Sequence, residues 1–258
     1  MNGAAFFDLD RTLMAGSSGM EFARVAARRG VVSRRLVARW AIDHVRYRIE
    51  GASDETTFEA LKIARESVTG VGEREIARMW PEVLAGILPR IHPEVLAEAH
   101  RHQDEGREAW IVSAAGSGMV ESLAGVLGFD GGIGTRYEVG PEGTYTGRID
   151  GPFVYGPGKV EAITALLEER PLDLADSWAY SDSISDLPML RATGSAVAVT
   201  PDRALREIAA AEGWEVMHLD RIGRRLAITG TVLLAGLVGG LGSYASSRRR
   251  DRPRRLFP

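Results

Sequence analysis

The chain has 258 residues, of which 45% are hydrophobic and 26% are charged. This length is near the upper limit for one compact unit, and the composition is that of a soluble globular protein rather than a disordered or repetitive one. The chain contains no cysteine. Disulfides, zinc–thiolate sites, iron–sulfur clusters and thiol nucleophiles are therefore excluded.

Charge is distributed unevenly along the chain, whose formal net charge is −3. Residues 221–258 contain nine arginines and one acid, Asp251, which gives them +8 and leaves −11 for residues 1–220. An acidic body lacks the basic stripe with which proteins bind nucleic-acid phosphates, so we predict no nucleic-acid partner. No cationic stretch precedes a long apolar core at the start of the chain, so we expect no secretory signal.

The first predicted element is a buried strand over residues 4–8, a short apolar run that ends in acids. A helical pattern follows from about Ser17 to Pro89 and contains no strand signal. We expect four helical segments there, near residues 18–29, 33–50, 54–68 and 73–88. Such a block is too long for one crossover connection, so it predicts a helical domain inserted after the first strand.

Beyond the helical block, the pattern alternates between helix and strand. We predict helices near 93–105, 117–127, 159–169 and 202–211, strands at 108–113, 177–181 and 195–200, and a hairpin within 133–149 around a turn at 140–143. Together these elements predict an α/β fold with a Rossmann-like parallel sheet of five or six strands. We expect a catalytic core (residues 1–16 and 90–220), a helical cap (17–89) and a C-terminal tail (221–258).

Polar residues follow three of the predicted strands, at the edge where open α/β sheets bind ligands. They are Asp8, Asp10 and Thr12 after the strand at 4–8, Ser113 at the end of the strand at 108–113, and Asp182 and Asp186 after the strand at 177–181. Lys159 begins a predicted helix behind Gly156 and Gly158. It can therefore bring a cation to the same edge.

Clustered carboxylates at this edge need a counterion. Two like charges about 4 Å apart repel by about 4 kcal/mol at an effective dielectric constant near 20, so the acids cannot all stay ionised unaided. The five histidines show no metal-ligand spacing. Carboxylate oxygens alone suit a hard ion, and Mg²⁺, which keeps waters and shares phosphate oxygens, is the expected cofactor.

Four motifs in the chain resemble those of the haloacid dehalogenase superfamily. They are FFDLDRTL (6–13), IVSAA (111–115), Lys159 and SDSISDLPML (181–190). The helical insertion and the last motif resemble subfamily IB, the phosphoserine-phosphatase-like group. The resemblance covers roughly residues 4–217 and implies a Mg²⁺-dependent phosphatase that works through an aspartyl-phosphate intermediate.

The resemblance also implies a role for each matching residue. The catalytic residues would be the nucleophile Asp8, the general acid Asp10, and Lys159, which would neutralise developing charge. The residues that hold the loop and the phosphoryl oxygens would be Thr12, Ser113 and Ala114. The Mg²⁺ ligands would be Asp8, Asp10 through its backbone carbonyl, Asp182 and Asp186.

Each motif also has a purely structural interpretation when it is taken alone. Ser113 could be a helix N-cap, which is the commoner role of a serine after a strand. Lys159 could be a solvated surface residue, and Asp182 and Asp186 could cap the helix that follows them. We favour the functional interpretation because the four motifs occur together and in this order.

The substrate side departs from the phosphoserine phosphatase pattern. Those enzymes typically carry a glutamate at the position where Ser17 stands here, and the nearest glutamate in this chain is Glu21. We therefore expect a small or lipid-linked phosphate monoester other than phosphoserine. Four residues of the predicted cap could contact such a substrate: Trp40, Arg46, Tyr47 and Arg48. An ordinary core stripe and solvated charges explain these residues more simply.

Two other activities remain open at this stage. A phosphotransferase or mutase would use the same aspartyl-phosphate but exclude water. A non-catalytic phospholigand-binding protein would not need the complete set of acids. A dehalogenase is disfavoured, because its chemistry needs neither Asp10 as a proton donor nor Mg²⁺.

Residues 226–247 contain no charge and are long enough for a membrane span. Their eight Leu, Ile and Val residues favour insertion by only about 2 to 5 kcal/mol. A span would also place six arginines opposite a cytoplasmic catalytic domain, against the positive-inside tendency. We expect a cytoplasmic catalytic domain with a tail that associates with the membrane surface, with a flexible or docked tail as the alternative. The oligomeric state is not predicted.

Overall fold

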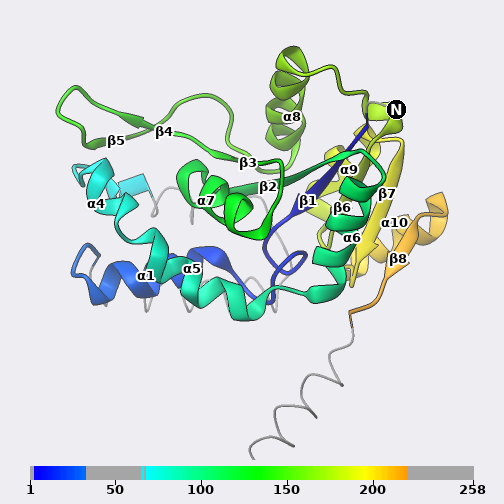
Figure 1. The fold of residues 1–258 in the computed structure, drawn as a ribbon, viewed down its shortest axis with the longest axis horizontal. Coiled ribbons are helices and arrows are strands. Elements are labelled where there is room, and N and C mark those ends of the chain that lie inside the picture. Colours follow the sequence, from blue (N-terminus) through cyan, green and yellow to red (C-terminus); the bar gives the residue numbers. More distant parts are fainter. Residues whose placement is uncertain (1–2, 33–64, 67, 220–258) are drawn as a thin grey trace, which may run out of the picture. The chain divides into compact units, whose positions relative to one another are not determined.

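The computed structural model describes residues 3–32, 65–66 and 68–219. Its main sheet is parallel throughout, with the strand order β3-β2-β1-β6-β7-β8 (Figure 1). These strands are β1 (Ala4–Asp8), β2 (Glu108–Gly116), β3 (Gly131–Thr135), β6 (Trp178–Ser181), β7 (Ser195–Val199) and β8 (Glu215–Met217). The predicted α/β, Rossmann-like fold is confirmed.

The described helices begin and end at residues that suit those positions. They are α1 (Ser18–Arg28), α4 (Glu73–Ala77), α5 (Trp80–Ile87), α6 (Pro93–Asp104), α7 (Ser117–Leu127), α8 (Pro157–Glu169), α9 (Leu187–Ala192) and α10 (Arg203–Glu212). Proline stands in the first turn of α5, α6, α8 and α9, where its missing N–H is not needed. Gly128 and Gly213 end α7 and α10 in the left-handed conformation.

Different helices cover the two faces of the sheet, because successive side chains of a strand point to opposite faces. Phe6 of β1 belongs to a buried cluster with residues of α8, α9 and α10. Its neighbour Phe7 stacks on Tyr180 of β6, with ring centroids 4.3 Å apart, and meets His102 of α6 edge-on. The run AAFFD is therefore buried on both sides, and β1 carries its acidic end to the middle of the sheet edge.

The predicted hairpin is present, but it uses only part of the expected segment. Its strands are β4 (Tyr137–Val139) and β5 (Tyr145–Ile149). The turn lies at residues 140–143, where Gly143 has a φ of 73°. The preceding strand β3 instead joins the main sheet beside β2. The hairpin projects beyond the end of β3 (Figure 1).

The predicted cap, residues 17–89, is described at its two ends, by α1 and by α4 and α5. The helix predicted at 33–50 and most of the one at 54–68 lie outside the described residues. The cap and core boundaries therefore stay predictions.

The chain divides after Met217 into two units, Met1–Met217 and His218–Pro258. The predicted membrane segment, residues 226–247, lies outside the described residues. Among the helices that the structure does describe, none has the length and apolar character of a membrane span.

Candidate active site

Asp8 ends β1, and Lys159 reaches it from the first turn of α8. Lys159 Nζ donates hydrogen bonds to Asp8 Oδ1 at 2.6 Å and to Asp186 Oδ2 at 2.8 Å. All three side chains are buried, with residue exposures of 8% for Asp8 and 2% for the other two. Burial acts to lower the pKa of Lys159, but the charges of Asp186 and Asp8 outweigh it and raise the pKa. Lys159 is thus a buried cation and not a solvated surface residue.

Asp186 turns its carboxylate into the site. Its Oδ2 also accepts a hydrogen bond of 2.7 Å from Ser181 Oγ, at the end of β6. Asp186 stands at the N-cap position of α9, yet its side chain makes no capping hydrogen bond there. The capping interpretation of this residue is therefore wrong.

Thr12 and Asp182 bind each other across the sheet edge. The Asp182 backbone N–H donates to Thr12 Oγ1 at 3.0 Å, and Thr12 Oγ1 donates to Asp182 Oδ1 at 3.4 Å. Arg11 Nε lies 3.1 Å from Asp182 Oδ2. Burial raises the pKa of Asp182 to about 8, opposed by the charge of Arg11 and reinforced by that of Asp8. The loop after β1 is thus fixed to the end of β6.

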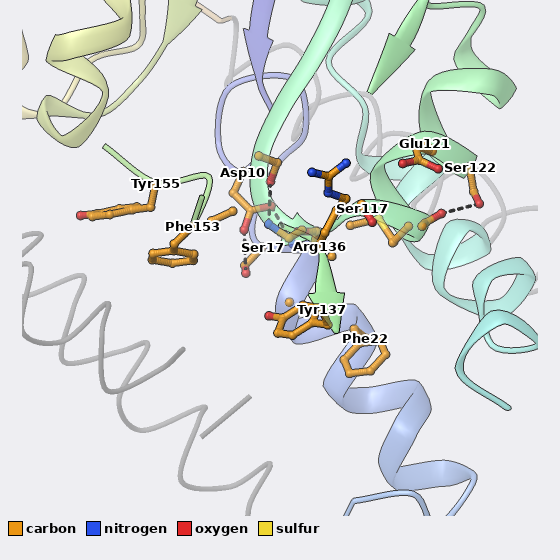
Figure 2. Close-up of a pocket in the computed structure, with 18 of the residues that line it drawn as sticks. Asp10, Ser17, Phe22, Ser117, Glu121, Ser122, Arg136, Tyr137, Phe153 and Tyr155 are labelled. Carbon is orange, nitrogen blue, oxygen red and sulfur yellow. Dashed lines mark hydrogen bonds between the residues drawn. The ribbon is translucent and has the colours of Figure 1, made fainter. Parts of the chain in front are cut away.

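Asp10 is held at the start of α1, where Figure 2 shows it beside Ser17. Ser17 Oγ donates to Asp10 Oδ2 at 3.0 Å, and the Ser18 backbone N–H donates to Asp10 Oδ1 at 2.9 Å. Ser17 occupies the N-cap position but makes no side-chain capping bond itself. The carboxylate of Asp10 takes that place, in keeping with the preference of helix N-termini for negative charge.

Ser113 and Ala114 continue β2 beyond the pair Asp8–Val112, in which the two parallel strands are in register. Ser113 Oγ accepts a hydrogen bond of 3.2 Å from the Ala115 N–H. The carbonyl of Ala114 accepts one of 2.9 Å from Thr135 Oγ1. The N-cap residue of α7 is Gly116, so Ser113 does not have the capping role considered above.

Seven of the eight predicted site residues line one cavity of about 850 Å³. They are Asp8, Asp10, Ser113, Ala114, Lys159, Asp182 and Asp186. Thr12 is fully buried and acts on the cavity through Asp182. The sequence interpretation missed Arg11, although it lies inside the first motif, and missed Ser181, which begins the last motif. It also missed the aromatic residues of the hairpin, which carry no pattern that points to a site.

The charges at the catalytic end of this cavity do not balance. Four carboxylates, Asp8, Asp10, Asp182 and Asp186, face two cations, Arg11 and Lys159, which leaves two negative charges if all are ionised. Burial raises the pKa of Asp8 to about 6, opposed by Lys159 and reinforced by Asp186. One divalent cation would neutralise this surplus.

The donors at the site fit Mg²⁺ in kind. Among the described residues, no three His, Asp or Glu side chains form a group that could hold a metal by themselves. The candidate donors are the carboxylates of Asp8 and Asp182 with the carbonyl oxygen of Asp10. A set of few protein oxygens suits Mg²⁺, which keeps several waters and shares phosphate oxygens.

Comparisons with known proteins agree with this geometry. Residues 5–191 match the family model described as haloacid dehalogenase-like hydrolase. Phosphoserine phosphatase SerB1 of Mycobacterium tuberculosis is 32% identical over 98% of this chain and 82% of its own. A histidinol-phosphatase of Neisseria meningitidis is 30% identical over 84% of this chain and 99% of its own.

A solved structure has a similar fold. The structure of a protein of unknown function from Bordetella pertussis superposes with a TM-score of 0.74 at 29% identity, over 85% of this chain and 99% of that one. The chain therefore belongs to the haloacid dehalogenase-like hydrolase family and is a hydrolase of its phosphoserine-phosphatase-like type.

Proposed function

We propose that this hydrolase is a Mg²⁺-dependent phosphatase, which transfers the phosphoryl group of a monoester first to Asp8 and then to water. The observation that carries the proposal is the position of Lys159, buried between Asp8 and Asp186 in the cavity that Asp182 also lines. Phosphoryl transfer depends mainly on positioning and charge neutralisation, and this arrangement offers both. Two relatives whose names identify them as phosphatases support the proposal.

In the first step, a carboxylate oxygen of Asp8 attacks phosphorus while the bond from phosphorus to the leaving oxygen breaks. Asp10 gives its proton to that oxygen, so the alcohol leaves neutral. Lys159, 2.6 Å from Asp8, lies next to the charge that develops on the phosphoryl oxygens. Ser113 and the backbone at Ala114 are proposed to hold those oxygens.

In the second step, water attacks the aspartyl-phosphate and Asp10 takes its proton. The bond from phosphorus to Asp8 breaks, which frees inorganic phosphate and restores the carboxylate. Ser17 and Ser18 donate hydrogen bonds to the two oxygens of Asp10, which keeps the same carboxyl group in place for both steps.

We assign the Mg²⁺ donors to the carboxylates of Asp8 and Asp182 and the carbonyl of Asp10. Asp186 would complete or orient this set through its bond to Lys159, and Thr12 would fix Asp182. When bound, Mg²⁺ supplies neutralisation of the phosphoryl charge.

Phosphoserine remains a poor candidate substrate, because Ser17 stands where phosphoserine phosphatases typically carry a glutamate, and no other glutamate takes over that role. Glu21 is buried, lies 2.7 Å from Arg90 Nη2 and also bonds Arg24. It is not among the described residues that line the cavity. The carboxylate of Glu21 therefore pairs with arginines of the protein and does not bind a substrate amino group.

The proposal is tested by a screen for inorganic phosphate released with and without Mg²⁺. The panel contains phosphoserine, histidinol phosphate, lysophosphatidate, glycerol phosphates and nucleotides. Release that requires Mg²⁺ and stops on chelation is the expected result. Transfer of the phosphate to another acceptor in place of water would favour the phosphotransferase alternative.

We also propose that residues 226–247 bring the enzyme to a membrane surface, since they are uncharged and flanked by arginines. A fluorescent reporter fused to residues 221–258 should sediment partly with membranes after fractionation. Recovery of the reporter wholly in the supernatant would contradict this part of the proposal.

A further inference from the structure

The cavity extends well beyond the catalytic residues. Its volume of about 850 Å³ falls in the range of about 300 to 1,000 Å³ typical of sites that enclose a whole small molecule. The rest of its described lining includes six aromatic rings, each partly exposed. They are Phe22, Trp80, Tyr137, Tyr145, Phe153 and Tyr155. Covering such rings with an apolar ligand is favourable, because it removes apolar surface from water.

Four of these rings come from one part of the chain, which we call the aromatic wall: Tyr137, Tyr145, Phe153 and Tyr155. The rings of Tyr137 and Tyr145 meet edge-on with centroids 6.2 Å apart, and those of Phe153 and Tyr155 stack at 5.7 Å. Figure 2 shows Phe153 and Tyr155 to one side of Asp10 and Tyr137 below it. The wall and the proposed proton donor therefore line the same cavity, so a substrate whose leaving oxygen meets Asp10 can place the rest of its leaving group against these rings.

Backbone hydrogen bonds hold the hairpin in place. The Gly70 N–H donates to Tyr145 O at 2.8 Å, the Tyr145 N–H donates to Val71 O at 2.9 Å, and the Glu73 N–H donates to Gly143 O at 2.9 Å. The hairpin is thus fixed to the segment that leads into α4.

Thr135 connects the wall to the strand that carries Ser113. This residue is fully buried, and its Oγ1 donates to Ala114 O at 2.9 Å and accepts from the Val154 N–H at 3.3 Å. Val154 stands between Phe153 and Tyr155. The position of these two rings is therefore tied to the backbone proposed to hold the phosphoryl oxygens.

The charged residues of the outer cavity are mainly acidic. Glu73, Glu121 and Asp150 line it together with Arg136, and Arg136 Nε lies 4.0 Å from Asp150 Oδ2. A second negative charge on the substrate would meet more acids than bases here. The lining therefore disfavours a leaving group that carries a carboxylate.

We propose that the aromatic wall binds the leaving group, and that the enzyme prefers phosphate monoesters of alcohols that carry an apolar ring and no carboxylate. This inference rests on the proposed phosphatase function. It also assigns part of the specificity to the hairpin and the segment after it, which the sequence interpretation had not singled out.

The test compares 2-phenylethyl phosphate with ethyl phosphate, whose leaving alcohols are both primary and similar in acidity. A difference in kcat/KM then reports the binding of the ring and not the chemistry at phosphorus. We expect 2-phenylethyl phosphate to be better by about tenfold or more, as burial of a ring implies. We expect phosphoserine to be poorer than 2-phenylethyl phosphate.

The Tyr137→Ala variant tests whether the aromatic wall causes this difference in kcat/KM between the two esters. Its kcat/KM for 2-phenylethyl phosphate should fall at least about tenfold more than that for ethyl phosphate. Glu138→Ala is the matched control, since Glu138 lies on the same strand but bonds Thr146 and Arg148, outside the cavity lining. It should keep both values. Should Tyr137→Ala fail to fold, Phe153→Leu serves for the same comparison.

These experiments distinguish failure of the inference about the aromatic wall from failure of the proposed phosphatase function. Equal kcat/KM for the two esters in the wild type, or equal proportional losses in Tyr137→Ala, would overturn the role of the wall and leave the phosphatase standing. Absence of Mg²⁺-dependent phosphate release from every ester would overturn the proposed function, and this inference with it.

Discussion

The hydroxyl of Ser17 donates a hydrogen bond of 3.0 Å to Asp10 Oδ2. Ser17 stands where phosphoserine phosphatases typically carry a substrate-binding glutamate, so a position expected to face the substrate here faces the proposed general acid. Because Ser18 of α1 holds the other oxygen, the orientation of Asp10 depends on where this helix begins.

Ser17→Ala should lower kcat by about tenfold, since a hydrogen bond to a charged group contributes about 1.5 kcal/mol, and should change KM little. Asp10→Asn should lower kcat more, by about 10²- to 10⁴-fold. Ser17→Thr keeps the hydroxyl and should restore kcat. An unchanged kcat in Ser17→Ala would remove its positioning role.

Lys159→Met should lower kcat by about 10²- to 10³-fold, because the cation beside the phosphoryl oxygens is lost. Without Mg²⁺ it should also lower the free energy of unfolding by about 3 to 5 kcal/mol near pH 7, since Asp8 and Asp186 then lack their buried partner. Both effects are measured on one preparation, by steady-state kinetics and urea denaturation.

The loss of stability in Lys159→Met should shrink near pH 5. Without Lys159 the pKa of Asp8 rises further in the folded state, so the folded protein binds more protons than the unfolded one and gains stability as the pH falls. Arg203→Met is the control, because the Arg203–Glu207 pair is exposed and worth at most about 0.5 kcal/mol. The same loss at both pH values would contradict this account.

His102 should make stability depend on pH. Burial lowers the pKa of this fully buried residue to about 4, helped by the charges of Arg101 and Arg107. Its Nδ1 accepts from Arg107 and its Nε2 bonds Tyr180 Oη at 2.8 Å, so the neutral ring fits and the cation does not. The unfolded chain binds the proton from about pH 6.5 downward, so stability present above that pH is lost as the pH falls toward 4.

The loss attributed to His102 should reach roughly 3 kcal/mol near pH 4. The measurement is the urea midpoint of wild type and His102→Gln from pH 7 to pH 4. The variant is expected to be less stable at pH 7 but to lose less on acidification. Parallel curves for the two proteins would show that His102 has no part in the pH dependence.

Asp182→Asn should raise the Mg²⁺ concentration needed for half-maximal activity by about tenfold or more, because it removes one of two carboxylates proposed as ligands. At saturating Mg²⁺ part of the activity should return. Asp104→Asn, at an exposed position of α6, should keep the wild-type requirement. An unaltered Mg²⁺ requirement in Asp182→Asn would take this residue out of the donor set.

The positions of the candidate site residues could be predicted from the sequence, because a local pattern marks the end of each buried strand. A buried apolar run followed by an acid fixes where Asp8 lies, and parallel pairing puts Ser113 one residue beyond the partner of Asp8. Lys159 follows a Gly-Pro-Gly run that begins α8. These are local signals, and the sheet brings them together without further information.

Other features depend on contacts that no local pattern records. The ion pair between buried Glu21 and Arg90 joins the beginning of the predicted cap to the first residue after it. The strand β8 is only three residues long and is defined by its pairing with β7. By contrast, the helix expected at 73–88 is interrupted between α4 and α5 by a local signal that the sequence interpretation missed. Pro81, in the first turn of α5, has no N–H with which to continue the hydrogen bonds of α4.

The most direct test of the central claim is to search for phosphate on Asp8. Wild type and Asp8→Asn are mixed with substrate and Mg²⁺, quenched in acid, digested and analysed by mass spectrometry. We predict a phosphoryl group on the wild-type peptide that contains Asp8, and neither this group nor phosphate release in Asp8→Asn. Phosphate release by Asp8→Asn at the wild-type rate would contradict the account.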